Sequence, residues 1–143
     1  MLSPADRFFI MKRVDFIQAE LEDLAEYQQI SFNDYTSNRK LQRNLERIAE
    51  NIANAIIDLC KILLSNTTQA IPDTYRDIIL KAGELESLDP AHASEIADIA
   101  RLRNILAHQY LDIKWDALKF FIAQADRIIR PFLSTIKDHY LSE

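Results

Sequence analysis

Residues 41–64 read LQRNLERIAENIANAIIDLCKILL, with apolar side chains three and four residues apart. This spacing is the period of one buried face of an α-helix. The face consists of Leu41, Leu45, Ile48, Ile52, Ala55, Leu59 and Ile62. Residues 31–34 (Ser-Phe-Asn-Asp) precede it and are suited to capping a helix, so the pattern predicts one long helix from there to about Leu64.

A second apolar seam lies upstream of this stretch. Ser3, Pro4 and Asp6 provide an N-cap, a proline at the first helical position and an early acidic residue, which together predict a helix start. The seam then extends this helix to about Ile30. Its residues are Ile10, Val14, Ile17, Leu21 and Leu24. If the turn is short, this helix runs antiparallel to the next one, with its acidic face in solvent.

Shorter helices are predicted in the second half of the chain. Residues 65–73 lack apolar periodicity and contain Pro72, so we expect a loop there. A helix should begin near Thr74 and end near Gly83, because glycine adopts the left-handed C-cap conformation at little cost.

The C-terminal third contains two further helical patterns. Asp89-Pro90 predicts the start of a helix that reaches about Tyr110, and Asp112-Ile113 leads into a last helix that Pro131 should kink or end. We therefore predict an all-α fold, an antiparallel helical bundle with two long and about three shorter helices. We expect residues 1–143 to form a single domain.

The composition favours helices and limits the classes of function. The 143 residues are 48% hydrophobic and include one glycine and four prolines, too few glycines for a phosphate-binding loop. The single cysteine, Cys60, lies in an apolar run and is expected to be a buried thiol in a reducing compartment. We see no signal peptide and no membrane span and expect a cytoplasmic protein. The net charge of −5 means that any RNA contact needs a local basic face.

Histidine spacing argues against a metal centre. His92, His108 and His139 are far apart in sequence, and no His-x3-His or Cys-x2-Cys pair exists. We therefore expect no metal site and no cofactor. His92, near a helix start, and His139, near the chain end, are both expected to be exposed.

His108 differs from the others because it lies in the polar stretch RLRNILAHQY, residues 101–110. On an ideal helix Asn104 shares a face with His108, and Arg103 shares another with Tyr110. Arg103 and His108 are about 140° apart around that helix. A joint site therefore needs a helix break after Ala107, the long reach of arginine, or a second subunit across a two-fold axis, which we favour.

Such a cluster has the groups for cleaving RNA without metal. An imidazole moves protons at the 2′-hydroxyl or the leaving oxygen, while a guanidinium stabilises charge on the phosphorane. Taken by spacing alone, however, an arginine and a histidine at a helix end more often form caps and surface hydrogen bonds.

The segment Arg103-Asn104-x3-His108-x-Tyr110 resembles the Arg-x4-His-x-Tyr signature of HepT-like toxins in the HEPN superfamily. The resemblance covers most of the chain, because three other segments are similar in order and spacing. These are residues 43–47 leading to 55–58, residues 71–76, and the hydrophobic last helix.

This resemblance implies an all-helical homodimer with its active site at the interface, acting as a metal-independent endoribonuclease. Arg103 and His108 are then the catalytic residues, with Asn104 supporting them. It also implies a partner, an MNT-type nucleotidyltransferase antitoxin, which silences the toxin by transferring AMP to Tyr110 in a type VII-like system. The alternatives are a non-catalytic partner that presents substrate to a nucleotidyltransferase, and a structural bundle without a site.

Two further features stay open at this stage. Arg39, Arg43 and Arg47 lie along one helical stripe, which either holds an RNA backbone or is a solvated face with salt bridges to the acidic first helix. Asp58 interrupts an apolar run, where a buried unpaired carboxylate would be costly. It could cap, pair with an arginine, or support the site.

Overall fold

The first helix begins as its sequence predicts. In the computed structural model, which describes residues 2–142, the Ser3 side chain accepts a hydrogen bond of 3.0 Å from the Asp6 amide, and Pro4 occupies the first turn of α1 (Pro4–Ala25). The elements that follow are α2 (Phe32–Ser37), α3 (Arg39–Ser65), α4 (Tyr75–Leu85), α5 (Pro90–Ile99), α6 (Arg101–His108), α7 (Leu111–Ile136) and the π-helix η1 (Lys137–Leu141). None of the residues in this range forms a strand, so the predicted all-α fold is confirmed.

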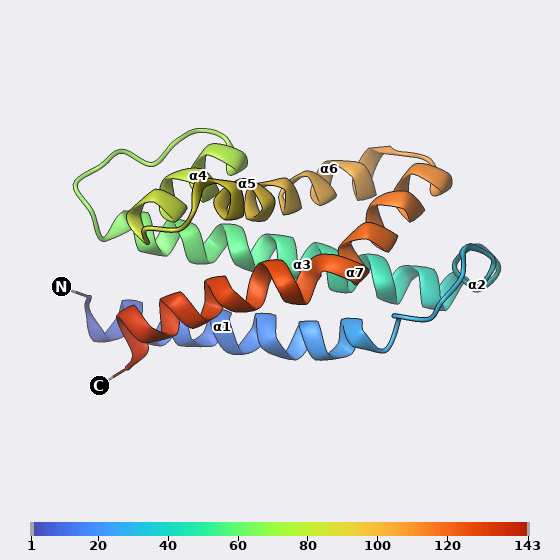
Figure 1. Ribbon diagram of the computed structural model, residues 1–143, viewed down its shortest axis with the longest axis horizontal. Helices are drawn as coiled ribbons and strands as arrows, with labels where there is room; N and C mark the ends of the chain where they lie inside the picture. The colour runs from blue at the N-terminus through green and yellow to red at the C-terminus, as the bar shows by residue number, and fades with distance from the viewer. Residues whose placement is uncertain (1, 143) are drawn as a thin grey trace.

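Three long helices form the body of the bundle. Figure 1 shows α1 and α3 running in opposite directions with α7 beside them. Helix α4 packs on α3 and lies alongside α5, and α5 leads into α6, which again contacts α3 (Figure 1). The structure thus has one more long helix than the two predicted, because α7 has 26 residues. Both ends of the chain lie at the same end of the bundle (Figure 1).

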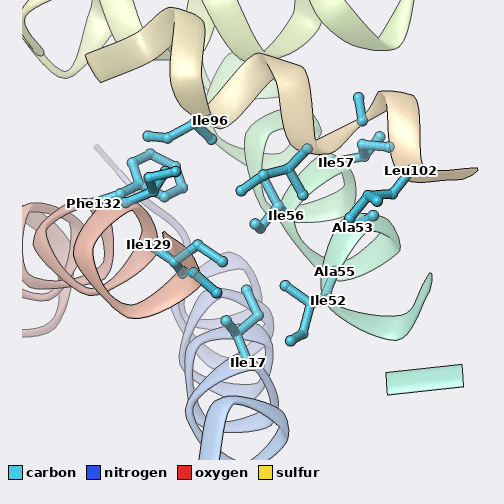
Figure 2. Packing of buried hydrophobic residues seen from close by; sticks show 14 of the residues in the cluster. Ile17, Ile52, Ala53, Ala55, Ile56, Ile57, Ile96, Leu102, Ile129 and Phe132 are labelled. Atoms are coloured by element: carbon cyan, nitrogen blue, oxygen red, sulfur yellow. The ribbon is translucent and has the colours of Figure 1, made fainter. Parts of the chain in front are cut away.

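The apolar seams meet in one core. All five predicted seam residues of α1 are buried, and Figure 2 shows Ile17 of α1 near Ile52 and Ile56 of α3 and Ile129 of α7. Ile96 of α5 closes the core from the other side (Figure 2). Cys60 is fully buried, as predicted, and burial raises the pKa of its thiol.

Two of the predicted helices are each divided in the structure. Asn38 is extended between α2 and α3, and its side chain caps α3 by accepting a hydrogen bond of 3.1 Å from the Leu41 amide. Ser31 and Asp34 form a separate capping box for α2. The helix expected from Asp89-Pro90 to Tyr110 is likewise interrupted by a turn at Ala100. Side-chain capping thus outweighs a continuous helical pattern at Asn38, and backbone turn bonds interrupt the pattern at Ala100.

The predicted C-cap role of Gly83 was wrong, and so was a helix end at Pro131. Gly83 lies inside α4 without a positive φ, and a Cβ there would be 2.8 Å from the Ala93 Cβ, so this glycine allows α4 and α5 to pack closely. Ser87 adopts the left-handed conformation instead, with φ 58°. Helix α7 continues past the exposed Pro131 because Phe132 and Leu133 remain in the core. Within residues 2–142 no helix is both long and apolar enough to cross a membrane.

Candidate active site

Helix α6 carries the polar stretch that the sequence singled out. Its Leu102 and Leu106 are buried against the body of the bundle, whereas Arg101, Asn104, Ala107 and His108 are exposed. Arg103 is half-buried. The local pattern of two apolar anchors four residues apart therefore presents the polar side chains to solvent.

The Arg103 guanidinium packs on an aromatic ring from another helix. Its Cζ lies 4.5 Å from the ring centroid of Tyr75, the first residue of α4. Hydrogen bonding and charge from Arg103 lower the pKa of the Tyr75 phenol. Both side chains line a surface hollow together with Glu50 of α3 and with Asn104 and Ala107 of α6.

His108 ends α6, and the chain turns sharply after it. Gln109 is extended and its amide donates to the Ile105 carbonyl over 3.0 Å, after which Tyr110 precedes α7. Tyr110 is 83% exposed, more than any other large hydrophobic or aromatic side chain described as exposed. The imidazole and the phenol are therefore both accessible to a macromolecule.

A single chain does not join the arginine and histidine. Helix α6 includes His108 and ends there, so no break separates His108 from Arg103, and the interruption within the predicted helix lies at Ala100 instead. No hydrogen bond connects Arg103 with His108 within the described range, because Arg103 is turned toward Tyr75. Asn104 likewise makes no hydrogen bond to His108 among residues 2–142 and lines the hollow beside Arg103.

Comparison with known proteins decides the family. The family model described as HepT-like, ribonuclease HepT-like, matches residues 17–136. The chain belongs to this ribonuclease family. A curated relative, the tRNA nuclease HepT of Aphanizomenon flos-aquae (strain 2012/KM1/D3), is 30% identical over 136 residues, which are 90% of this chain and 92% of that protein. The prediction of a HepT-like ribonuclease is thus confirmed.

The basic stripe of this HepT-like chain is exposed. Arg39, Arg43 and Arg47 belong to the N-terminal half of α3, over which α6 ends (Figure 1). Arg47 shares a shallow depression with acidic side chains of α1, including Glu20, but forms no ion pair of 4 Å or less in the described part of the chain. Glu46 does not pair with these arginines. It accepts a hydrogen bond of 2.6 Å from the Tyr35 hydroxyl and forms an ion pair with Lys114.

Asp58 is not the buried carboxylate that its neighbours in sequence suggested. Its side chain is exposed on α3 and lines a depression with Lys12, Arg13 and Phe16 of α1. The apolar run surrounds the helix on three sides only, so Asp58 occupies the remaining solvent-facing position and needs no buried partner.

The other two histidines have structural contacts. His92 was expected to be exposed but is half-buried, and its Nε2 donates 2.7 Å to the Ile128 carbonyl of α7. His139 is exposed on one side, and its Nδ1 lies 2.7 Å from Glu86. Within the described range, no three His, Cys, Asp or Glu side chains are grouped as metal ligands would be.

Tyr75 is the site residue that sequence reasoning did not assign. The sequence singles out residues 71–76 only for their similarity to the family in order and spacing, which assigns Tyr75 no role. The one signal that the sequence offers is the place of Tyr75 in the first turn of a short helix. Its partner, Arg103, is 28 positions later in the chain and comes close only through tertiary packing.

Proposed function

We propose that this HepT-like chain is a metal-independent endoribonuclease in which His108 moves protons at the 2′-hydroxyl or the leaving oxygen and Arg103 stabilises charge on the phosphorane. The single observation that carries the proposal is that α6 presents an accessible imidazole, His108, and a guanidinium, Arg103, which forms no ion pair of 4 Å or less with a carboxylate within residues 2–142. An imidazole titrates near neutral pH, and an unneutralised guanidinium is available for a phosphate. Asn104, in the same hollow as Arg103, has a supporting role.

The catalytic unit in this proposal is a homodimer. Arg103 points to α4 while His108 lies at the open end of α6, so one copy does not face both groups toward one phosphate. A two-fold axis beside α6 brings the His108 of each copy toward the Arg103 of the other. This arrangement supports an interface site without any change in the helices.

The proposed control is covalent. Tyr110 is the accessible phenol next to His108, and an MNT-type nucleotidyltransferase antitoxin would transfer AMP to its oxygen in a type VII-like, cytoplasmic toxin–antitoxin system. In that transfer the Tyr110 oxygen attacks the α-phosphorus of ATP, pyrophosphate leaves, and the phenol proton is lost. The added phosphate and nucleoside then occupy the space that RNA needs.

The proposed substrate is tRNA, and a relative and the charge pattern support it. The named relative is a tRNA nuclease, which makes tRNA the first substrate to test. The stripe of Arg39, Arg43 and Arg47 is exposed and offers a basic track for an RNA backbone on a chain whose net charge is −5.

The deciding experiment is cleavage of deproteinised tRNA in excess chelator. We expect cutting to persist and to leave a 2′,3′-cyclic phosphate, because the 2′-oxygen is the attacking group. Loss of cutting in chelator with recovery on adding magnesium contradicts the mechanism.

A second candidate is a non-catalytic helical partner that presents RNA or nucleotide to a nucleotidyltransferase. The observation that favours it is that Arg103 contacts Tyr75 and not His108. The two candidates differ in the purified protein, because the second one binds RNA without cutting it in every oligomeric state.

A further inference from the structure

The first turn of α4 is anchored on both sides of Tyr75. The Thr74 side chain caps the helix by accepting 3.1 Å from the Asp77 amide. Arg76 reaches α5, where its Nη1 pairs with Asp98 and its Nη2 donates 3.2 Å to Ser94. The backbone of Tyr75 is therefore fixed relative to α5, and α5 leads directly into α6.

The Tyr75 ring has two cationic neighbours. Arg103 lies 4.5 Å and the Lys61 ammonium 5.4 Å from its centroid. Both distances are within the range in which a ring quadrupole attracts a cation, and a planar guanidinium can also stack on the ring. Tyr75 is 43% exposed, so this contact is at the surface of the hollow and not in the core.

A neutral partner suits a guanidinium that has to bind a phosphate. A carboxylate would orient Arg103 but would also offset its charge, whereas an aromatic ring orients it and leaves the charge intact. Among residues 2–142 Arg103 has no carboxylate within 4 Å. Glu50 of α3 lines the same hollow but forms no ion pair with Arg103, so the site combines an oriented guanidinium with a positive charge that no carboxylate in this range contacts directly.

We infer that Tyr75 is a positioning residue whose ring, by stacking, holds the Arg103 guanidinium in the orientation that meets the RNA phosphate. The inference rests on the proposed role of Arg103. It assigns Tyr75 no proton transfer and no contact with the reacting atoms.

The first test compares Tyr75→Phe with Tyr75→Ala in tRNA cleavage. Phenylalanine keeps the ring, so we expect its kcat to stay within about 5-fold of wild type, whereas alanine should lower kcat about 30-fold with little change in KM. Ile71→Ala, an exposed apolar change in the preceding loop, is the matched control and should keep wild-type activity. Equal losses for both Tyr75 variants mean that the hydroxyl and not the ring accounts for the effect, and they overturn positioning by ring stacking.

A double-mutant cycle separates positioning from an independent RNA contact. In an Arg103→Lys background the charge remains but the planar group that stacks is gone, so Tyr75→Ala should cost less than about 3-fold. A full 30-fold loss in that background means that Tyr75 works without Arg103 and overturns the inference. Thermal unfolding of each variant within a few degrees of wild type supports it, because the ring is surface-exposed.

A third measurement does not depend on cleavage. The Tyr75 phenol is followed by the NMR signal of its Cζ carbon during a pH titration, assigned by its absence in Tyr75→Phe. We expect Arg103→Ala to raise the pKa of Tyr75, and an unchanged pKa overturns the contact. If wild type titrates in this way but never cuts RNA, the proposed nuclease function fails while the Arg103–Tyr75 contact stands.

Discussion

Glu86 and Arg103 are the central charges of two polar clusters that differ in burial and in how completely the charge is paired. Glu86 is 3% exposed and both of its oxygens are occupied, by the His139 Nδ1 at 2.7 Å and the Tyr140 hydroxyl at 2.6 Å. Arg103 is half-buried, rests on the neutral ring of Tyr75, and lies near a histidine without any bond to it in the described part of the chain.

The difference separates stability from function. The Glu86 cluster ties η1 to the end of α4, at the end of the bundle where both chain ends lie (Figure 1). A buried carboxylate with a donor on each oxygen is satisfied, and its burial leaves it inaccessible to a ligand. The groups around Arg103 are exposed and incompletely paired, which costs little at the surface and leaves them available for RNA.

The largest expected effect is on the exposed cluster. His108→Ala should lower tRNA cleavage at least about 10³-fold, equivalent to about 4 kcal/mol, because it removes the proton-transfer group, and Arg103→Ala should lower it similarly through lost charge stabilisation. His139→Ala is the matched histidine control and should keep cleavage per folded molecule. Full activity in a folded His108→Ala or Arg103→Ala protein removes that residue from the mechanism.

The buried cluster should show the opposite phenotype. Glu86→Ala removes the acceptor of two hydrogen bonds and should lower the free energy of unfolding by about 2 kcal/mol, as measured in urea, while cleavage per folded molecule is unchanged. Glu84→Ala, an exposed change two residues earlier in α4, should stay within about 0.5 kcal/mol of wild type. Equal destabilisation by both substitutions shows that the Glu86 hydrogen bonds contribute nothing beyond helix propensity.

A smaller effect is expected at Tyr110. Tyr110→Phe removes the acceptor oxygen but keeps an exposed ring, so cleavage should stay within about 3-fold of wild type. With the nucleotidyltransferase of its own system and ATP, intact-mass measurement should find AMP-sized additions on wild type and none on Tyr110→Phe. Equal modification of both places the acceptor elsewhere, and no modification by an active partner favours inhibition by binding alone.

The smallest expected effect is on the free energy of unfolding at alkaline pH, through Tyr140 and Tyr35. Burial and hydrogen bonds to Glu86 and Glu46 raise the pKa of Tyr140 and Tyr35 above the usual value near 10. Because the folded state favours the neutral phenols, their stabilising contribution is complete below about pH 10 and declines as the pH rises through the raised values. Urea unfolding from pH 9 to 11 should show this decline, and Tyr140→Phe should flatten it. An equally steep decline in Tyr140→Phe assigns the effect to other groups.

The fold was predictable because its signals are local. The seam from Ile10 to Leu24 and the face from Leu41 to Ile62 have helical spacing, and their residues lie on the core side of α1 and α3. The motif residues were identified for the same reason, since Arg103 and His108 are only five positions apart. Their catalytic roles remain predictions.

The wrong predictions concern residues whose structural role depends on contacts with another helix or with the core. Gly83 resembled a helix end, but the Cβ of Ala93 on α5 requires a residue without a side chain there. Pro131 resembled a stop, but the burial of Phe132 and Leu133 outweighs the lost backbone hydrogen bond. His92 was assigned to solvent because the Ile128 carbonyl that receives its hydrogen bond is 36 positions away.

The sequence by itself determined the helical class, the apolar faces, the buried Cys60 and the polar stretch on α6, because periodicity and spacing along one helix are local properties. Only the tertiary structure decided that Glu86 is enclosed between His139 and Tyr140 and that Arg103 rests on Tyr75. Those contacts join residues 28 to 54 positions apart. Packing between helices decides that the Glu86 carboxylate is fully hydrogen-bonded and that the Arg103 guanidinium stays available to a ligand. Periodicity within one helix does not encode such contacts.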